Sequence, residues 1–365
     1  MSNTILEYEN LQKVNEKLFS AYEASFQDFL KSGRYMLGQA VSTFERQFAH
    51  YCGTKHCVGV ASGLDALILA IDACRFDKGS EIIVPSNTYI ATFLAILRCG
   101  HIPVLVEPDI QTYTIDPTKI ESAITKKTKA ILVVHLYGKS AEMEPIIHIA
   151  THHGLHIIED AAQAHGASYK GTKVGGFGVG CFSFYPTKNL GALGDAGAIT
   201  SFDQDVMEKV ISLRNYGSSA KYENDSIGYN SRLDEVQAGF LSIKLGILDE
   251  INAHKRALAK LYFEHLDDRY TKPVVHRDYV DVYHIFTIRC SKRDQLKNFL
   301  LDNKVQTEIH YPIAPHHQKS MQNILQGRFP ISEEIHSTTL SLPISFFHTK
   351  DDIIRVIDIM NKWLK

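Results

Sequence analysis

The chain has 365 residues, with 39 lysines and arginines against 41 aspartates and glutamates, and a formal net charge of −2. This balance argues against nucleic acid as the main partner, because neutralising phosphates requires a basic face. The N-terminal segment MSNTILEYENLQKVNEK has no apolar signal-peptide core, and no apolar run approaches the length of a membrane span. We therefore expect a cytoplasmic protein that binds neither nucleic acid nor membrane.

From about residue 40, short apolar bursts alternate with longer amphipathic stretches. The bursts predict strands at 56–61, 81–85, 102–108, 129–138 and 155–160. The stretches predict helices at 44–53, 63–74, 89–100 and 144–154. Strands this apolar are buried on both faces, so the pattern indicates an α/β fold with a mostly parallel sheet covered by helices.

The alternation of strand and helix patterns ends in the last third of the sequence. A helical pattern runs through residues 235–265 without a strong break. After it come a strand-like segment and two helical segments, at 283–290, 293–303 and 351–364. We expect a large domain over residues 1–252, with an N-terminal helical segment, and a smaller α+β domain over residues 253–365. The long helix would join them.

One segment, CFSFYPTKNLGALGDAGAIT (181–200), places a lysine where an apolar run ends. CFSFY reads as a buried strand, and Lys188 follows it in a loop. A surface lysine is the ordinary interpretation. Gly191, Gly194 and Gly197 favour another, because glycines leave room for something to approach the backbone.

Two further pieces stand at predicted strand ends, where open α/β sheets bind ligands. Ser62, Gly63 and Leu64 form a turn that opens a helix, and backbone amides there can bind an anion. Asp160 directly follows a strand, with Gln163 three residues later. Each piece alone has an ordinary reading, as a common turn or as a helix-capping aspartate.

Together with Lys188, these pieces match the needs of pyridoxal 5'-phosphate. The cofactor needs an anion site for its phosphate, a carboxylate against its ring nitrogen and a lysine for the Schiff base. The turn at residues 62–64, Asp160 and Lys188 supply these parts in a plausible order.

Two other motifs resemble sites of a different kind. GGFGVG (175–180) resembles a dinucleotide loop, but a strand follows it instead of the helix that the fingerprint requires. His148 and His152 lack the glutamate of a zinc-binding HExxH motif, so we expect no metal site. We expect His165 to pack in the wall of the active site.

The chain resembles DegT-type sugar aminotransferases, which are pyridoxal phosphate enzymes of the aspartate aminotransferase fold type (fold type I). The resemblance covers nearly the whole length. The motifs that carry it are GRYMLGQAVSTFERQFAHYCGTKHCVGVASGLDAL, PSNTYIAT, IIEDAAQAHGA, SFYPTKNLGALGDAGA, RNYGS, GYNSRLDEVQA, EIHYP and LSLPIS.

The resemblance implies roles for four residues around the cofactor ring. Lys188 would be the Schiff-base lysine and would carry the proton between the cofactor and the amine carbon. Asp160 would pair with the pyridinium nitrogen, and Gln163 would contact the 3-oxygen of the ring. Tyr89 resembles the aromatic residue that stacks on the ring.

The resemblance also implies a phosphate site and a homodimer. Gly63, Leu64 and Ser183 would hold the phosphate, although SGL stands here where SGT is common in the family. Only a backbone contact is needed at that position. Asn230 resembles the residue that reaches the phosphate from the neighbouring subunit, which implies active sites shared between subunits.

On the substrate side, the lysine segment resembles the branch that aminates 3-keto sugars. Tyr185 and Asp195 stand where the 4-keto branch more often has a histidine and a glutamate. His310 and Tyr311 resemble residues that line the sugar side of the 3-keto site; a core aromatic and a structural turn are the ordinary alternatives. Arg232 could grip the diphosphate, since a guanidinium can bind two oxygens at once.

The reaction implied is the transfer of an amino group from L-glutamate to a dTDP-linked 3-keto-6-deoxyhexose. The product would be a 3-amino-3,6-dideoxyhexose for a surface polysaccharide such as lipopolysaccharide, with the gluco or galacto configuration left open. The alternatives are an aminotransferase for a 4-keto nucleotide sugar and a non-catalytic or regulatory member of the fold.

Overall fold

The structure, a computed structural model, describes residues 4–363. The helices are α1 (Leu11–Asn15), α2 (Phe19–Ser32), α3 (Gln39–Cys52), α4 (Gly63–Ala73), α5 (Ile90–Arg98), α6 (Met143–His153), α7 (Gln204–Leu213), α8 (Glu235–Leu245), α9 (Leu248–His265), α10 (Arg293–Asp302), α11 (Pro330–Thr338) and α12 (Lys350–Lys362). In the described part of the chain, no helix is long and apolar enough to cross a membrane.

The strands alternate with these helices through the first two hundred residues. They are β1 (His56–Val60), β2 (Glu81–Pro85), β3 (Ile102–Val106), β4 (Thr128–Val134), β5 (His156–Asp160), β6 (Ser168–Tyr169), β7 (Thr172–Lys173), β8 (Val179–Ser183), β9 (Gly197–Ser201), β10 (Ser218–Ala220), β11 (Glu223–Asn224), β12 (Tyr279–Val280), β13 (Phe286–Arg289) and β14 (Thr339–Leu342).

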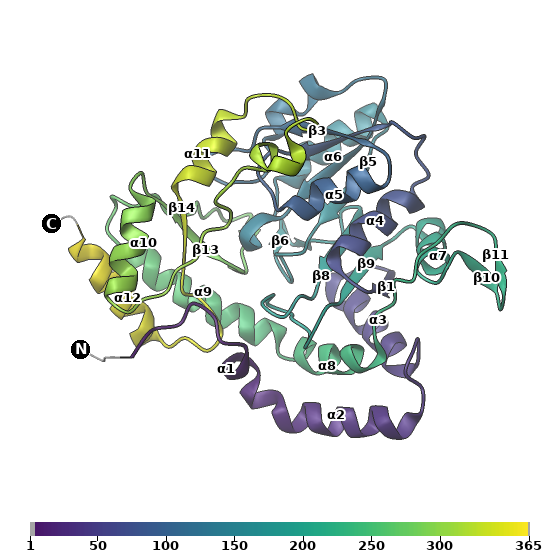
Figure 1. The fold of residues 1–365 in the computed structure, drawn as a ribbon, viewed down its shortest axis with the longest axis horizontal. Helices are drawn as coiled ribbons and strands as arrows, with labels where there is room; N and C mark the ends of the chain where they lie inside the picture. The colour runs from purple at the N-terminus through teal and green to yellow at the C-terminus, as the bar shows by residue number, and fades with distance from the viewer. Residues whose placement is uncertain (1–3, 364–365) are drawn as a thin grey trace.

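Seven strands form the central sheet, in the order β1-β9-β8-β5-β4-β2-β3 (Figure 1). Only β9 runs against its neighbours; the other strands are parallel to one another. The predicted α/β fold with a mostly parallel sheet is therefore confirmed. The register sets Asp160 of β5 opposite Val134 of β4 and Cys181 of β8. The carboxyl ends of these strands consequently meet at one edge of the sheet.

Both faces of the sheet are buried. Ile82 and Val84 of β2 pack in one core with α4, α5 and α7, while Ile83 between them packs in another core with α6. A third core joins α3 and α8 to the sheet around β8. Because successive strand residues face opposite sides, a strand covered on both sides must be apolar throughout.

The last hundred residues build a separate apolar core. The antiparallel pair β13–β14 packs with α9, α10 and α12, and Leu6 from the start of the chain joins this core through a parallel bridge to Val305. Both ends of the chain therefore lie on the same side of the molecule (Figure 1). We propose that the division into residues 1–252 and 253–365 describes two domains, which α11 connects because Ile335 packs in the core around α4.

The helix predicted over residues 235–265 is two helices. The prediction of one continuous helix was wrong at Gly246, where α8 ends, and Ile247, whose φ of −116° and ψ of 9° are not helical. Glycine is a poor helix former because it loses more backbone entropy than alanine. Gly246 itself keeps right-handed helical angles (φ −60°, ψ −21°), and the break follows at Ile247.

The GGFGVG segment binds a carboxylate of its own chain. Glu159, which is fully buried, accepts hydrogen bonds from the amides of Gly175 (2.7 Å), Phe177 (2.8 Å) and Gly178 (2.8 Å). His135 Nε2 lies 3.0 Å from the same carboxylate, while its Nδ1 accepts from Ala141 N, so Nε2 carries the proton. The loop therefore anchors the start of β8 to β5 and has no amides left over for a dinucleotide at these positions.

We expect Glu159→Ala to lower the free energy of unfolding by about 3 kcal/mol, because it leaves several buried amides without an acceptor. Glu159→Gln keeps one acceptor oxygen and should cost less. Urea unfolding followed by circular dichroism measures both. Glu142→Ala, at an exposed position, is the control. Equal losses for Glu142→Ala and Glu159→Ala would show that the carboxylate does not anchor the loop.

Candidate active site

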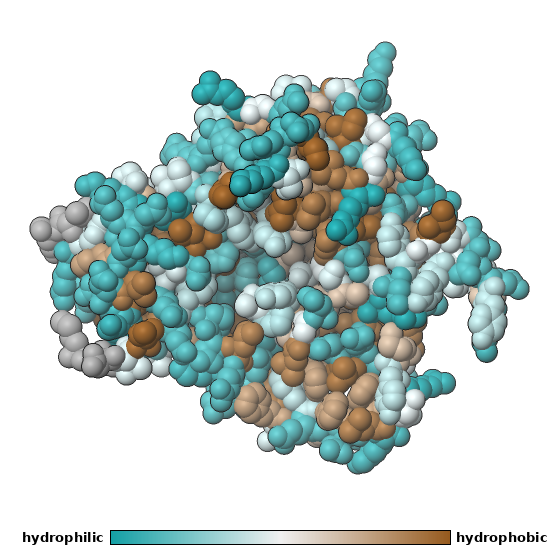
Figure 2. All heavy atoms as spheres, viewed as in Figure 1, coloured by the Kyte–Doolittle hydropathy of each residue, from teal (hydrophilic) through white to brown (hydrophobic). Residues whose placement is uncertain are grey.

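A cavity of about 550 Å³ lies at the carboxyl edge of the sheet, and residues of both proposed domains line it. Figure 2 shows the surface hollowed near the middle of the view, between the two parts of the chain. Of the residues selected from the sequence, those that line the cavity are Gly63, Leu64, Tyr89, Asp160, Gln163, Ser183, Tyr185, Lys188, Asp195, His310 and Tyr311.

The turn before α4 forms one end of the cavity. Ser62 caps the helix, since its Oγ accepts a hydrogen bond from Asp65 N at 3.1 Å. Gly63 presses against Ser183 so closely that a Cβ at position 63 would lie 2.5 Å from the Cβ of Ser183. The first amides of α4 have no partner within the helix, and Ser183 adds a hydroxyl beside them. This end is therefore suited to an anion.

Asp160 is buried at the end of β5, with 6% of its surface exposed. Burial raises the pKa of its carboxyl, while hydrogen bonds from Thr92 Oγ1 (2.8 Å) and Ala162 N (3.2 Å) act in the opposite direction. The positive charge of Lys188 also lowers this pKa. A cationic partner in the cavity would favour the ionised form further.

Lys188 follows β8 in the loop, as the sequence predicted, and its amine projects into the cavity. Burial lowers its pKa from 10.5 to about 8, although the negative charge of Asp160 opposes the shift. A larger share of this amine is therefore neutral near pH 7 than for an ordinary lysine. A neutral amine is the form that attacks a carbonyl carbon.

Another wall of the cavity is built by segments that are far apart in the sequence, around residues 137, 163 and 311. Gln163 Oε1 accepts from Tyr137 N at 2.8 Å, and its Nε2 donates to the Tyr311 hydroxyl at 3.0 Å. The Tyr137 hydroxyl donates in turn to the backbone oxygen of His310. The rings of Tyr89 and Tyr311 lie 5.1 Å apart. The smaller domain is thus hydrogen-bonded to the floor of the cavity.

Two selected residues do not line this cavity. Asn230 is exposed, and Arg232 donates to Asn215 Oδ1 at 3.1 Å while its guanidinium stands over the ring of Tyr216. Ser231 between them bonds to Asp65 Oδ2, on the first turn of α4. The segment is therefore anchored behind the anion end of the cavity within its own chain.

The three glycines after Lys188 make room mainly for the protein itself. A Cβ at Gly191 would lie 2.2 Å from Pro186 O, and one at Gly197 would lie 2.4 Å from Ser62 O. The sequence correctly indicated a close approach to the backbone. At these two positions the approaching group is the chain's own carbonyl.

Sequence reasoning missed four residues of the site. Thr92, Tyr137, Thr187 and His284 either line the cavity or bond to residues that do. A histidine within the apolar run YHIF and a threonine within YIATFLAIL are signals that could have marked two of them. His165 packs against the rings of Phe182 and Phe184, and burial lowers its pKa to about 3.

The groups present fit pyridoxal 5'-phosphate. The cavity offers a helix start with a serine beside it, a buried carboxylate and an amine of lowered pKa, which are the three kinds of group that this cofactor requires.

Comparison with known proteins agrees with this fit. Residues 19–361 match the DegT/DnrJ/EryC1/StrS aminotransferase family. The chain is 50% identical over 356 residues to "dTDP-3-amino-3,6-dideoxy-alpha-D-galactopyranose transaminase" of Aneurinibacillus thermoaerophilus, which covers 97% of this chain and 98% of that protein.

Two solved structures are similar throughout. Streptomyces venezuelae DesV, in complex with a ketimine intermediate, superposes with a TM-score of 0.97 at 43% identity and covers 99% of both chains. NtdA of Bacillus subtilis, with bound cofactor PMP, superposes with a TM-score of 0.93 at 29% identity and covers 99% of this chain and 85% of its own. The chain belongs to the DegT/DnrJ/EryC1/StrS aminotransferase family and is a pyridoxal phosphate-dependent aminotransferase of fold type I.

Proposed function

We propose that the protein aminates a dTDP-linked 3-keto-6-deoxyhexose, with L-glutamate as donor, to give a 3-amino-3,6-dideoxyhexose for a surface polysaccharide. The observation that carries this proposal is that Tyr185, His310 and Tyr311 line the same cavity as Lys188. The name of the Aneurinibacillus relative supports a 3-amino-3,6-dideoxy sugar as the product. The alternative acceptor is a nucleotide sugar with its keto group at C4.

The resemblance to the family supports the roles proposed here for four residues at the cofactor ring, all of which line the cavity. Lys188 would form the covalent link, and Asp160 would face the ring nitrogen. Gln163 would contact the 3-oxygen, and Tyr89 would stack on the ring. At the anion end, Gly63, Leu64 and Ser183 would bind the phosphate.

Once bound, pyridoxal 5'-phosphate supplies an electron sink for the bonds of the amine-bearing carbon. Asp160, held by Thr92 and Ala162, presents a carboxylate that stabilises positive charge on its partner. Lys188 accepts or returns a proton at its Nζ, which its lowered pKa permits near neutral pH. The hydrogen bond between Gln163 Nε2 and the Tyr311 hydroxyl fixes both side chains in the wall of the cavity.

We also propose a homodimer in which Asn230 and Arg232 serve the cavity of the partner subunit. Both residues lie outside the cavity of their own chain. Tyr222, in the turn of the protruding β10–β11 hairpin, and Ile227, just after it, have 90% and 97% of their surface exposed, so a partner that covered them would bury apolar area. Apolar residues also gather on the face formed by α2 (Figure 2).

Gly63→Ala should weaken cofactor binding roughly 10- to 100-fold, because the new methyl group must displace Ser183 from the anion site. Titration with pyridoxal phosphate, followed by absorbance, measures the affinity. Gly239→Ala is the matched control. Gly239 lies on α8, and a Cβ there would meet only the hydroxyl of Ser25. Unchanged affinity in Gly63→Ala would remove the turn from the phosphate site.

Mixing Lys188→Ala and Asn230→Ala chains should restore activity if the active sites are shared. Each mixed dimer would contain one site with both native residues, so random exchange should recover about a quarter of the wild-type sites. The assay needs proof of subunit exchange, for example by mass spectrometry of the intact dimer. Exchange without recovery would contradict a site shared through Asn230.

The acceptor is tested by offering the enzyme the dTDP-linked 3-keto gluco and galacto sugars and the matching 4-keto sugar, each with L-glutamate. We expect one of the 3-keto sugars to have at least a roughly tenfold higher kcat/KM than the 4-keto sugar. Replacing glutamate by L-alanine should slow the reaction. Faster turnover of the 4-keto sugar would overturn the proposed acceptor but not the aminotransferase chemistry.

A further inference from the structure

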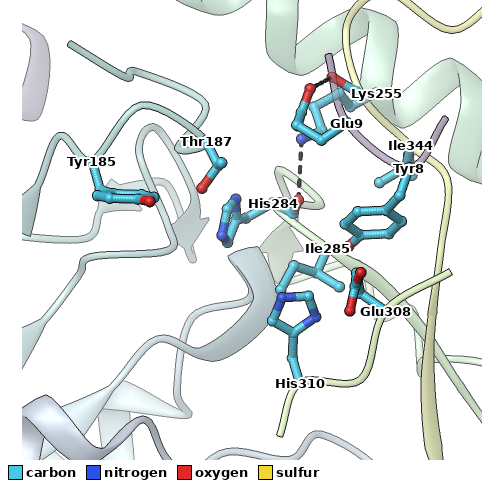
Figure 3. Close-up of a pocket in the computed structure, with 11 residues that line it drawn as sticks. Tyr8, Glu9, Tyr185, Thr187, Lys255, His284, Ile285, Glu308, His310 and Ile344 are labelled. Atoms are coloured by element: carbon cyan, nitrogen blue, oxygen red, sulfur yellow. Dashed lines mark hydrogen bonds between the residues drawn. The ribbon is translucent and has the colours of Figure 1, made fainter. Parts of the chain in front are cut away.

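A histidine stands beside the amine of Lys188, in the wall between two cavities. His284 Nε2 lies 3.5 Å from Lys188 Nζ. Besides the active-site cavity, His284 lines a second chamber of about 320 Å³, formed with the N-terminal segment and the smaller domain (Figure 3). His284 therefore borders both spaces, the one that Lys188 lines and the one that Tyr8 and Glu308 line.

The tautomer of His284 follows from its other nitrogen. Nδ1 is buried and has no hydrogen-bond partner among residues 4–363. A proton on Nδ1 would be a buried donor without an acceptor, which is costly. Burial and the nearby charge of Lys188 also lower the pKa of the ring well below its usual value, so the ring is neutral. Opposite a neutral lysine amine, the single proton is therefore best placed on Nε2, where the amine can accept it.

The backbone of His284 is held firmly. Lys255 Nζ donates to His284 O at 3.1 Å and to Asn189 Oδ1 at 2.8 Å, so one side chain ties His284 to the residue next to Lys188. On the other side, a Cβ at Gly138 would lie 2.6 Å from His284 N. The chain therefore has little freedom to move the ring away from the lysine.

We propose that His284 is a positioning residue that donates its Nε2 proton to the amine of Lys188 whenever that amine is free and neutral. The lone pair of a neutral amine can accept a hydrogen bond from an N–H group, but an ammonium ion has no lone pair. The contact with His284 therefore favours the neutral form of Lys188. A separation of 3.5 Å makes a weak bond, which lets the amine turn away to react. The inference rests on Lys188 being the cofactor lysine, as proposed above.

Other charged and titratable groups also face Lys188. Asp160 on β5 favours the ammonium form. Lys255 on α9 and Lys188 repel one another, and each has a pKa of about 8 because of burial. His165 and His310 are neutral at pH 7, since burial lowers their pKa values to about 3 and about 4. A test must therefore alter His284 and leave these groups in place.

The test reads the ionisation of Lys188 directly. The full-length protein, loaded with pyridoxamine phosphate so that Lys188 remains uncondensed, carries ¹³C at the ε-carbon of lysine, and Lys188→Met assigns the resonance. We expect His284→Phe to raise the pKa of Lys188 by roughly half to one unit, because the donor to the neutral amine is lost. His284→Gln keeps an N–H group at the end of its side chain and should raise it by less than half as much.

The controls and contrary outcomes are distinct. His152→Phe, on the exposed face of α6, should leave the pKa of Lys188 unchanged. An unchanged or lowered pKa in His284→Phe, or equal rises in the Phe and Gln variants, would overturn the proposal. If the variants fail to fold, ¹⁵N shifts of the wild-type ring, read at a pH above the pKa of Lys188, decide the matter, because a proton on Nδ1 opposite the neutral amine contradicts the proposal. These resonances are read without turnover, so failure here leaves the proposed sugar specificity untouched.

Discussion

The buried carboxylate of Glu159 is the interaction on which the rest of the site depends. It accepts hydrogen bonds from three amides of the loop just before β8 and from the ring of His135, which lies just after β4. The Glu159 carboxylate therefore links three neighbouring strands of the sheet, β8, β5 and β4. A carboxylate without these partners could not remain in the interior, since burying an unpaired charge is very costly.

That anchor sets the register from which the chemistry follows. With Asp160 paired opposite Cys181, the last residue of β5 and the end of β8 face the same cavity. Ser183 then meets Gly63 at the start of α4, and the loop after the strand carries Lys188 to the carboxylate. Tight backbone contacts at Gly197 leave this arrangement little room to shift. A binding site built on strand ends inherits the rigidity of the sheet.

The two ionisable groups Asp160 and Lys188 are partly or fully removed from solvent at the cavity. Burial raises the pKa of Asp160 and lowers the pKa of Lys188, so each group moves towards its neutral form. The attraction between the two opposes both shifts. A cofactor with a cationic ring and an anionic phosphate would complement this distribution, and the family to which the chain belongs uses such a cofactor.

The sequence by itself determined the alternation of strands and helices, the mostly parallel sheet, and the places of Asp160 at the end of a strand and of Lys188 in the loop after another. These features depend on local periodicity and on residues adjacent to a strand. It did not predict the break at Ile247, just after Gly246, which divides one predicted helix into two. Only the tertiary structure placed His284 beside Lys188 and kept Asn230 and Arg232 outside the cavity of their own chain. His284 and Lys188 are 96 positions apart, and no periodic pattern connects them; the packing of the smaller domain against the edge of the sheet brings them together.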